Sequence, residues 1–357
     1  TWQRLGRAGR RQRTALGVLV ASSLPLDQYI IRNPEFFLGA SPEQARIDPD
    51  QLLILLDHVR CAAFELPFGE GECFGREDLS ELLGYLEEHG VVHREGHQWH
   101  WMADSYPANS VSLRSVAEGN FVVIDTTHGG QTVIAEVDYS SAPETIYEGA
   151  IYMIQSAPYQ VERLDWDGRK AFVTRTQADY YTDAIDYTRL KILEGFEQQQ
   201  DVAQGEVHLV RRIVGYKKIR YYTHENIGYG NIDLPDQEMH TTAAWWQLDP
   251  DALDAAFASR QQALDGFLGA AYALHHVAAL QSMSETSDLG RAVGDGDGKW
   301  FATAGADGRG QMRDVGGEAV APDHQGVFRP AVFLYDAYPG GIGLSEPLFR
   351  DQHAIDA

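Results

Sequence analysis

The sequence is poor in cysteine, in long apolar runs and in cations. Of its 357 residues only Cys61 and Cys73 are cysteines, too few for a disulfide framework or a four-thiolate zinc site. No apolar run reaches the roughly 18 residues that a membrane-spanning helix needs, and no apolar signal core follows the basic first residues. We therefore expect reduced cysteines and a cytoplasmic, nucleoid-associated protein without a membrane partner.

Acidic residues outnumber basic ones by 52 to 29, which gives a net charge of −23. This balance opposes general adhesion to a duplex, because phosphate binding depends on Lys and Arg. The cations are concentrated in two segments, one with Arg4, Arg7, Arg10, Arg11 and Arg13, the other with Arg211, Arg212, Lys217, Lys218 and Arg220. Such a distribution favours binding along a local track.

The length and the 44% of hydrophobic residues suit roughly two to three folded units. The chain begins without Met and ends without an evident helix cap, so we expect it to be a fragment. The patterns below predict a multidomain α+β protein with four segments. These are residues 1–40, the end of a RecA-like domain and a connector; 41–120, a winged helix; 121–232, a small β-barrel; and 233–357, a C-terminal scaffold.

The first half of the chain carries helix and hairpin signals. The aliphatic run 14–20 predicts a buried strand. Asp48-Pro49 predicts a helix start, and leucines at helical spacing predict a second helix over 76–89. The alternating segment VVHREGHQWHWM predicts a β-hairpin around Glu95-Gly96. Two helices followed by a small hairpin are typical of a winged helix.

The second half begins with strands. Between residues 121 and 229 apolar runs recur at strand length with turns between them, which favours a small barrel. Asp249-Pro250 predicts the start of a long helix that reaches about residue 283. The Gly- and Asp-rich segment 293–325 predicts a surface loop. The following AVFLYDAYPGGIGL predicts a strand that ends in a structural Pro-Gly-Gly turn.

The most informative short motif is QRLGRAGR, from Gln3 to Arg10. Two arginines three residues apart can stabilise the charge of a transferring phosphoryl group; the alternative is a solvated basic tail. The motif resembles motif VI of superfamily 2 (DEAD/DEAH-box-like) helicases. This resemblance implies arginine fingers at Arg7 and Arg10 and nucleotide contacts through Gln3, with Gly6 and Gly9 beside it.

The sequence contains no G-x-x-x-x-G-K-[ST] motif, which would cradle the β-phosphate and Mg²⁺. We therefore expect ATP and Mg²⁺ to serve an intact helicase, while this chain alone is inactive as an ATP hydrolase.

Longer segments resemble MrfA-like helicases, which have a C-terminal zinc-binding domain. They are IIRNPEFFLGASPEQARIDPDQLLILLDHVRCAAFELPF, SETSDLGR and VFLYDAYPGGIGLSEPLF, which begin at Ile30, Ser284 and Val332. The resemblance implies 3′ to 5′ translocation on single-stranded DNA and a role in DNA repair. The family's four-cysteine cluster beyond the Pro-Gly-Gly motif is absent, so we expect zinc in a missing C-terminal segment and none in this chain.

Two segments are candidates for nucleic-acid binding. In the predicted wing, Arg94 and Trp99 could stack on a displaced base, although such wings often serve for packing. In RRIVGYKKIRYYTHENIGYG, alternate faces of a strand could present cations to phosphates and tyrosines to bases. This second segment supplies the candidates Arg211, Arg212, Tyr216, Lys217, Lys218 and Arg220, although an exposed strand face above an aromatic core would show the same pattern.

These features together predict a C-terminal fragment of an ATP-dependent DNA helicase that contacts single-stranded DNA. Two alternatives stay open: a non-enzymatic protein-interaction module with an acidic surface, and a fragment of an RNA helicase. The sequence leaves the oligomeric state open.

Overall fold

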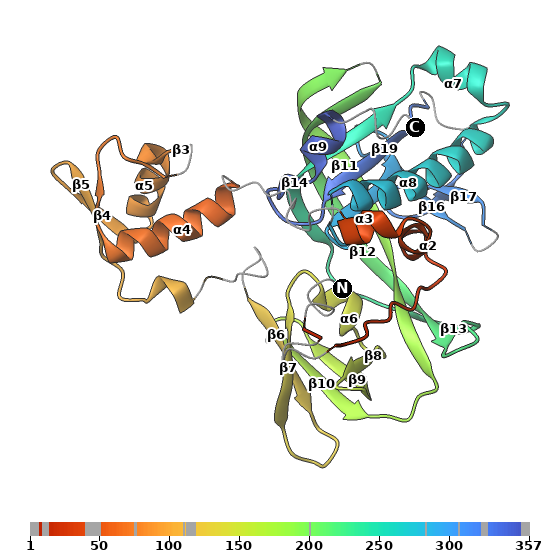
Figure 1. The fold of residues 1–357 in the computed structure, drawn as a ribbon, viewed down its shortest axis with the longest axis horizontal. Coiled ribbons are helices and arrows are strands. Elements are labelled where there is room, and N and C mark those ends of the chain that lie inside the picture. Colours follow the sequence, from red (N-terminus) through yellow and green to blue (C-terminus); the bar gives the residue numbers. More distant parts are fainter. Residues whose placement is uncertain are drawn as a thin grey trace.

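The computed structural model describes residues 7–8, 14–39, 51–74, 77–109, 111, 119–199, 201–282, 284–305, 308–322 and 328–350. It shows a mixed α+β protein with a small helical part at one end, a five-stranded sheet and a larger curved sheet covered by helices (Figure 1). The predicted multidomain α+β class is confirmed. None of the helices in the described ranges has the length and apolar character to cross a membrane.

The segment before the winged helix contains two short helices, α2 (Pro25–Arg32) and α3 (Pro34–Gly39). The buried strand predicted for 14–20 is wrong. Leu16 and Val20 are 87% and 85% exposed, and no strand of the described residues pairs with this run. An aliphatic run becomes a buried strand only where a sheet offers it hydrogen-bonding partners and a covered face.

The winged helix consists of two helices and a small sheet. Its elements are α4 (Leu52–Glu65), β1 (Phe68–Gly69), β2 (Cys73–Phe74), β3 (Glu77–Asp78), α5 (Leu79–Glu88), β4 (Val92–Glu95) and β5 (Gln98–Trp101), with a 3-10 turn at Pro107–Asn109. The predicted hairpin turns at Gly96, whose φ of 62° suits glycine. Leucines at helical spacing on α5 pack against α4, so the periodicity of the sequence determines this small core.

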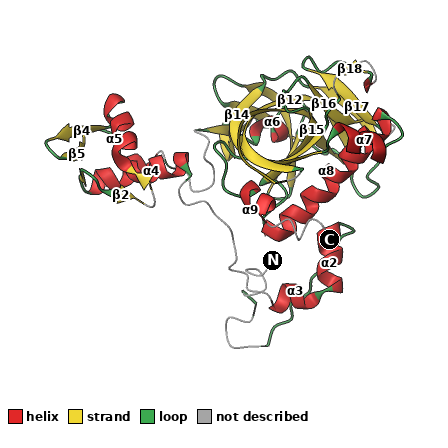
Figure 2. Cartoon of the chain, turned by 90° about the horizontal axis from the view of Figure 1, so that it is seen from above, coloured by secondary structure: helices red, strands yellow, loops and turns green. Residues whose placement is uncertain are grey.

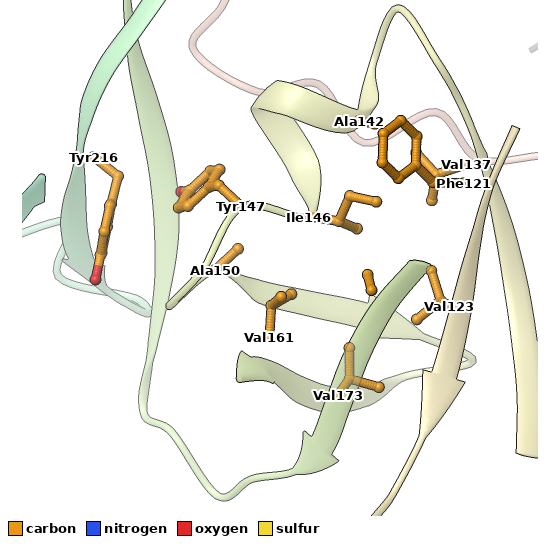
Figure 3. Packing of buried hydrophobic residues seen from close by; sticks show 11 residues of the cluster. Phe121, Val123, Val137, Ala142, Ile146, Tyr147, Ala150, Val161, Val173 and Tyr216 are labelled. Carbon is orange, nitrogen blue, oxygen red and sulfur yellow. The ribbon is translucent and has the colours of Figure 1, made fainter. Parts of the chain in front are cut away.

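The next unit is a five-stranded sheet in the order β7-β6-β10-β9-β8. Its elements are β6 (Asn120–Asp125), β7 (Thr132–Asp138), α6 (Ala142–Thr145), β8 (Ile151–Ile154), β9 (Ala157–Asp165) and β10 (Lys170–Arg175). Strands β6 and β10 are parallel, and the other neighbours in the sheet are antiparallel. Figure 3 shows the core of this unit, in which Ile146 and Tyr147 lie between the sheet and Tyr216 of a neighbouring strand.

The largest sheet has nine strands. They are β11 (Tyr180–Gln199), β12 (Val202–Arg220), β13 (Asn226–Asn231), β14 (Gln237–Gln247), β15 (Leu289–Gly294), β16 (Trp300–Ala304), β17 (Gly310–Asp314), β18 (Ala319–Val320) and β19 (Ala331–Asp336). Their order is β11-β12-β14-β19-β15-β16-β17-β18, with β13 paired to β12.

This sheet is strongly curved (Figure 2), and β11 contacts both β15 and β16. The N–H of Ile192 donates to the carbonyl of Gly296 at 2.8 Å, and Arg189 donates to the carbonyl of Gly298 at 3.2 Å. The barrel that the sequence predicts for 121–232 therefore differs from the structure. Residues 120–175 form the separate five-stranded sheet, and the curved, barrel-like arrangement is built from strands between 180 and 336.

Helices cover the outer face of the curved sheet. They are α7 (Pro250–Ala256), α8 (Arg260–Ser282) and α9 (Ser345–Arg350). Leu264 and Phe267 of α8 pack against Trp300 and Met312. The surface loop predicted for 293–325 is therefore wrong over β16 and β17. Short strands separated by Gly- and Asp-rich turns have a low apolar content even when alternate side chains enter a core.

The Pro-Gly-Gly segment forms a turn between β19 and α9 that Asp336 holds in place. The buried carboxylate of Asp336 accepts N–H groups from Ile342, Gly343 and Ser345 at 2.7 to 2.8 Å. Burial raises the pKa of Asp336, and the backbone donors oppose that rise. These bonds match the structural role predicted for this turn.

Candidate nucleic-acid interface

Strand β12 carries most of the residues predicted to contact nucleic acid, and its tyrosine points into a core. Tyr216 is 8% exposed and packs on Tyr147 with 5.0 Å between ring centroids (Figure 3). A Cβ at Gly149 or Gly230 would overlap the Tyr216 side chain, so the two glycines make room for it. In this arrangement the ring of Tyr216 is not accessible to a nucleic-acid base.

Three of the predicted cations already have carboxylate partners. Arg211 pairs with Glu144 and lies 4.0 Å from Asp186, and burial lowers its pKa. Arg212 donates a hydrogen bond to each carboxylate oxygen of Asp236, both at 2.7 Å. Arg220 is exposed and lies 3.7 Å from one oxygen each of Asp179 and Glu225. These pairs neutralise much of the positive charge of the track.

The two lysines of the track lie on opposite faces of β12, because side chains alternate along a strand. Lys218 is half-buried, with its ammonium 5.5 Å from the centre of the Tyr180 ring. Lys217 lines a large groove instead, and no carboxylate of the described residues lies within ion-pair distance of it. Lys218 likewise has no ion pair among the described residues and both lysines are half-buried, so Lys217 is distinguished by its position in the groove.

The groove has a volume of about 1050 Å³ and is formed by β11, β12, β13, α8 and the sheet from β15 to β17. Three tyrosines from different elements line it, Tyr187, Tyr229 and Tyr272. Arg291 on β15 lines it as well. Aromatic rings beside cations are the combination that single-stranded nucleic acid requires, since rings stack on bases and cations meet phosphates.

Arg291 is exposed, and its environment leaves its charge uncompensated. Its Nη1 donates to Nδ1 of His275 at 3.0 Å, and its guanidinium carbon lies 5.2 Å from the centre of the Tyr272 ring. Within the described ranges no carboxylate forms an ion pair with Arg291. The guanidinium is thus held in place by uncharged neighbours.

The carboxylates of the groove are engaged elsewhere. Asp265 accepts the N–H of Gly310 at 2.6 Å and the amide of Gln261 at 3.1 Å. Asp186 accepts the hydroxyl of Thr188 at 2.8 Å and lies near Arg211. Their negative charge is therefore partly compensated by these partners.

Arg313 also lines the groove, but its guanidinium serves the fold. It donates to the side chains of Thr303 and Gln311 and to the carbonyl of Gly317, at 2.8 to 3.0 Å. It also lies over the Tyr187 ring, 4.6 Å from its centre. These contacts leave Lys217 and Arg291 as the two cations of the groove without a dense network of protein partners.

The predicted wing residues are arranged for packing. Trp99 is 5% exposed and belongs to the winged-helix core, so its ring is covered. Arg94 lies over that ring at 4.8 Å and donates to Glu70 at 2.9 Å. A hydrogen bond from His97 and the charge of Arg94 lower the pKa of Glu70. The wing is thus tied to the loop around Glu70 on one side.

Most of the N-terminal motif falls outside the described residues, namely Gln3, Gly6, Gly9 and Arg10. Arg7 lies in a turn and is exposed. The predicted arginine fingers therefore stay a prediction. The described residues contain no cluster of three or more His, Cys, Asp or Glu side chains that could hold a metal ion.

The sequence pattern missed Arg291, Tyr187 and Tyr272, whereas Tyr229 lies within the segment RRIVGYKKIRYYTHENIGYG but was not named as a candidate. Arg291 belongs to the segment SETSDLGR, which resembles MrfA-like helicases but has no spacing typical of nucleic-acid binding. The tyrosines lie on three elements that are far apart in the chain. No local spacing could have indicated that they share a groove.

The known proteins to which this chain is similar are ATP-dependent helicases. The family profile described as the winged helix domain of the ATP-dependent helicase HRQ1 matches residues 47–116. The chain is 39% identical over 355 residues to the ATP-dependent helicase YprA of Bacillus subtilis, covering 98% of this chain and 43% of YprA. It is 33% identical over 219 residues to HRQ1 of Saccharomyces cerevisiae, covering 59% of this chain and 19% of HRQ1.

Solved structures give the same result. A crystal structure of the DUF1998 helicase MrfA bound to DNA matches with a TM-score of 0.60 and 37% identity, over 99% of this chain and 44% of MrfA. A structure of MrfA bound to DNA and AMPPNP matches with a TM-score of 0.58 and 38% identity, over 99% of this chain and 43% of MrfA. The chain thus spans less than half the length of the relatives named here.

Proposed function

We propose that this chain is a C-terminal region of an ATP-dependent helicase of the HRQ1 and MrfA type, and that its groove binds single-stranded DNA. Two cations that line the groove, Lys217 and Arg291, support this proposal most directly. Neither forms an ion pair with a carboxylate of the described residues. The rest of the positive track on β12 is largely paired.

The chemistry of the groove supports a single strand as the ligand. A phosphodiester backbone needs cations at intervals, and unpaired bases need flat apolar surfaces. Lys217 and Arg291 supply the first, and Tyr187, Tyr229 and Tyr272 supply the second. The related MrfA has been crystallised with DNA, which favours DNA over RNA for this chain.

We also propose that in the intact enzyme ATP and Mg²⁺ bind in the motor, where Gln3 and the arginines Arg7 and Arg10 contact the nucleotide's phosphates. Translocation in the 3′ to 5′ direction and a role in DNA repair follow from the family resemblance alone.

Binding of a fluorescent oligothymidine to the 357-residue chain, measured at several salt concentrations, tests the groove. Lys217→Glu should weaken binding about tenfold or more, because a charged hydrogen bond to phosphate contributes roughly 1.5–3 kcal/mol. The slope of log K against log[salt] should also become shallower by about 0.7, the value for one lost phosphate contact on a single strand.

Lys170→Glu is the matched control, since Lys170 is exposed on β10 and does not line the groove. Equal losses for the two variants would show that only net charge matters. Unchanged binding by Lys217→Glu would refute the groove as the binding site. Competition with an RNA strand of the same sequence decides between the two nucleic acids, because the 2′-hydroxyl is what a protein can sense.

A further inference from the structure

His275 of α8 is buried behind the groove, and its hydrogen bonds determine its tautomer. The side chain is 6% exposed. Its Nε2 lies 2.8 Å from the carbonyl oxygen of Leu289 and 3.0 Å from that of Thr286. Carbonyl oxygens only accept hydrogen bonds, so Nε2 carries the proton and Nδ1 is left with a lone pair.

That lone pair faces Arg291. The guanidinium Nη1 of Arg291 lies 3.0 Å from Nδ1 and can only donate, so the pair forms one well-defined hydrogen bond. A second proton on His275 would remove the acceptor and place two positive charges side by side. Burial, together with the charge of Arg291, lowers the pKa of His275 and keeps the ring neutral.

A neutral acceptor can orient an arginine without cancelling its charge, whereas a carboxylate does both. Asp236 orients Arg212 but also cancels its charge. His275 orients Arg291 and leaves its full charge directed to the groove. The Tyr272 ring beneath the guanidinium restricts its plane without neutralising it.

The other titratable groups near this pair have partners of their own. Asp288, just before β15, accepts the hydroxyl of Tyr338 at 2.8 Å and the N–H of Glu285 at 3.0 Å. His276, the neighbour on α8, is hydrogen-bonded to the carbonyl of Tyr272 at 2.8 Å. Neither group competes for Arg291 through any contact in the described structure.

We propose that His275 is a positioning residue, which holds Arg291 over Tyr272 so that the guanidinium binds a phosphodiester of the strand in the groove. The proposal rests on the proposed function of the groove. Arg291 can meet a phosphate through two parallel N–H groups while His275 holds a third, a geometry that the planar guanidinium permits and an ammonium does not.

Two substitutions of His275 separate its two hydrogen bonds. His275→Asn places an acceptor near the position of Nδ1 and loses the bonds to the carbonyls. His275→Gln places a donor near the position of Nε2 and loses the acceptor for Arg291. Oligothymidine affinity is measured for both variants, for Arg291→Ala, and for the double variant His275→Gln with Arg291→Ala.

Arg291→Ala is expected to weaken binding about tenfold, which corresponds to roughly 1.4 kcal/mol. His275→Gln should lose a similar factor, His275→Asn should retain most of the affinity, and the double variant should bind no more weakly than Arg291→Ala alone. Such non-additivity shows that His275 acts through Arg291, since a general loss of structure would add to the first defect.

Several outcomes would overturn the proposal, and they differ from a failure of the groove itself. Additive losses in the double variant, or full affinity in His275→Gln, would refute the positioning role while Arg291→Ala still weakens binding. If both Arg291→Ala and Lys217→Glu bind as well as the unchanged chain, the groove is not the site. Urea unfolding of each variant shows that it is folded under the assay conditions.

If His275→Gln does not fold, the oligothymidine affinity of Arg291→Lys tests the positioning role in its place. Lysine keeps the charge but cannot hold His275 and grip a phosphate with a planar fork. The proposal predicts a severalfold loss of affinity for Arg291→Lys, and an affinity equal to that of the unchanged chain would overturn it.

Discussion

The side-chain amide of Gln51 joins the winged helix to the Pro-Gly-Gly turn near the other end of the chain. Its Nε2 donates to the carbonyl oxygen of Pro339 at 2.9 Å, while its Oε1 caps α4 by accepting the N–H of Ile54 at 2.8 Å. Gly340 follows with a φ of 77°, and a Cβ there would overlap the Gln51 amide. One buried side chain thus caps the start of α4 and holds the Pro-Gly-Gly turn.

Gln51→Ala should lower the free energy of unfolding by about 1–3 kcal/mol, since it removes a helix cap and leaves the partly buried carbonyl of Pro339 without its donor. Gln51→Asn separates the two effects, because Asn still caps a helix but is too short to reach Pro339. Urea denaturation measures both. Equal stability of Gln51→Asn and the unchanged chain would mean that the bond to Pro339 contributes nothing.

Asp336→Asn should destabilise the chain by about 2–4 kcal/mol, because an amide replaces one acceptor oxygen by a donor that faces backbone N–H groups. The measurement is the midpoint of urea unfolding. Glu346→Gln, which lies on the exposed side of α9 near Arg350, is the control and should change stability by less than about 1 kcal/mol. A small effect of Asp336→Asn would show that the turn is held by other contacts.

Tyr216→Ala should lower stability by about 3–5 kcal/mol, the usual loss when a large aromatic side chain is removed from a core. Oligothymidine affinity of the folded variant should stay within about twofold of the unchanged chain, since the ring does not line the groove. Tyr229→Ala provides the contrast, because Tyr229 is exposed and lines the groove. It should weaken binding by about 1–3 kcal/mol with little loss of stability. The opposite ranking of the two variants would contradict the assignment of Tyr216 on β12 to a core and of Tyr229 on the neighbouring β13 to the groove.

The pair between Arg212 and Asp236 predicts a pH-dependent stability. The hydrogen bonds from Arg212 lower the pKa of Asp236 in the folded chain. The stabilisation is therefore fully present above the pKa of an unfolded Asp, about 3.9, and is lost as the pH falls through the lower folded pKa. Asp236→Asn should cost stability near neutral pH, and its difference from the unchanged chain should shrink below about pH 4.

Urea unfolding at a series of pH values measures this difference. Asp167→Asn, in an exposed turn, removes the same charge and should show a much smaller effect. A loss in Asp236→Asn that stays constant down to the acid limit would show that the ion pair is not its cause.

Local signals in the sequence determined several elements correctly. Asp249-Pro250 begins α7, where the Asp249 side chain accepts the N–H of Asp251 at 2.9 Å. The single long helix predicted to reach about residue 283 is wrong, because α7 ends at Ala256 and a separate helix, α8, begins at Arg260. The leucine spacing of α5 and the Glu95-Gly96 turn of the wing are also present. In each case the responsible forces act between residues a few positions apart, such as a cap, a helical face or a glycine at positive φ.

The tertiary structure alone decided which predicted site residues are available. Arg211, Arg212 and Lys217 look alike in the sequence, but carboxylates from Glu144 and Asp236, brought close by the fold, occupy the first two. Tyr216 and Lys217 are neighbours on opposite faces of one strand, one in a core and the other in the groove. The partner of Arg291 is His275, which lies 16 residues away in the chain and on another element.

The sequence by itself determined that this chain is related to helicases and that positive charge would follow one strand. Only the tertiary structure decided where that charge remains free. An ion pair depends on the distance between side chains that lie far apart in the chain, and that distance exists only after the sheets have curled and packed.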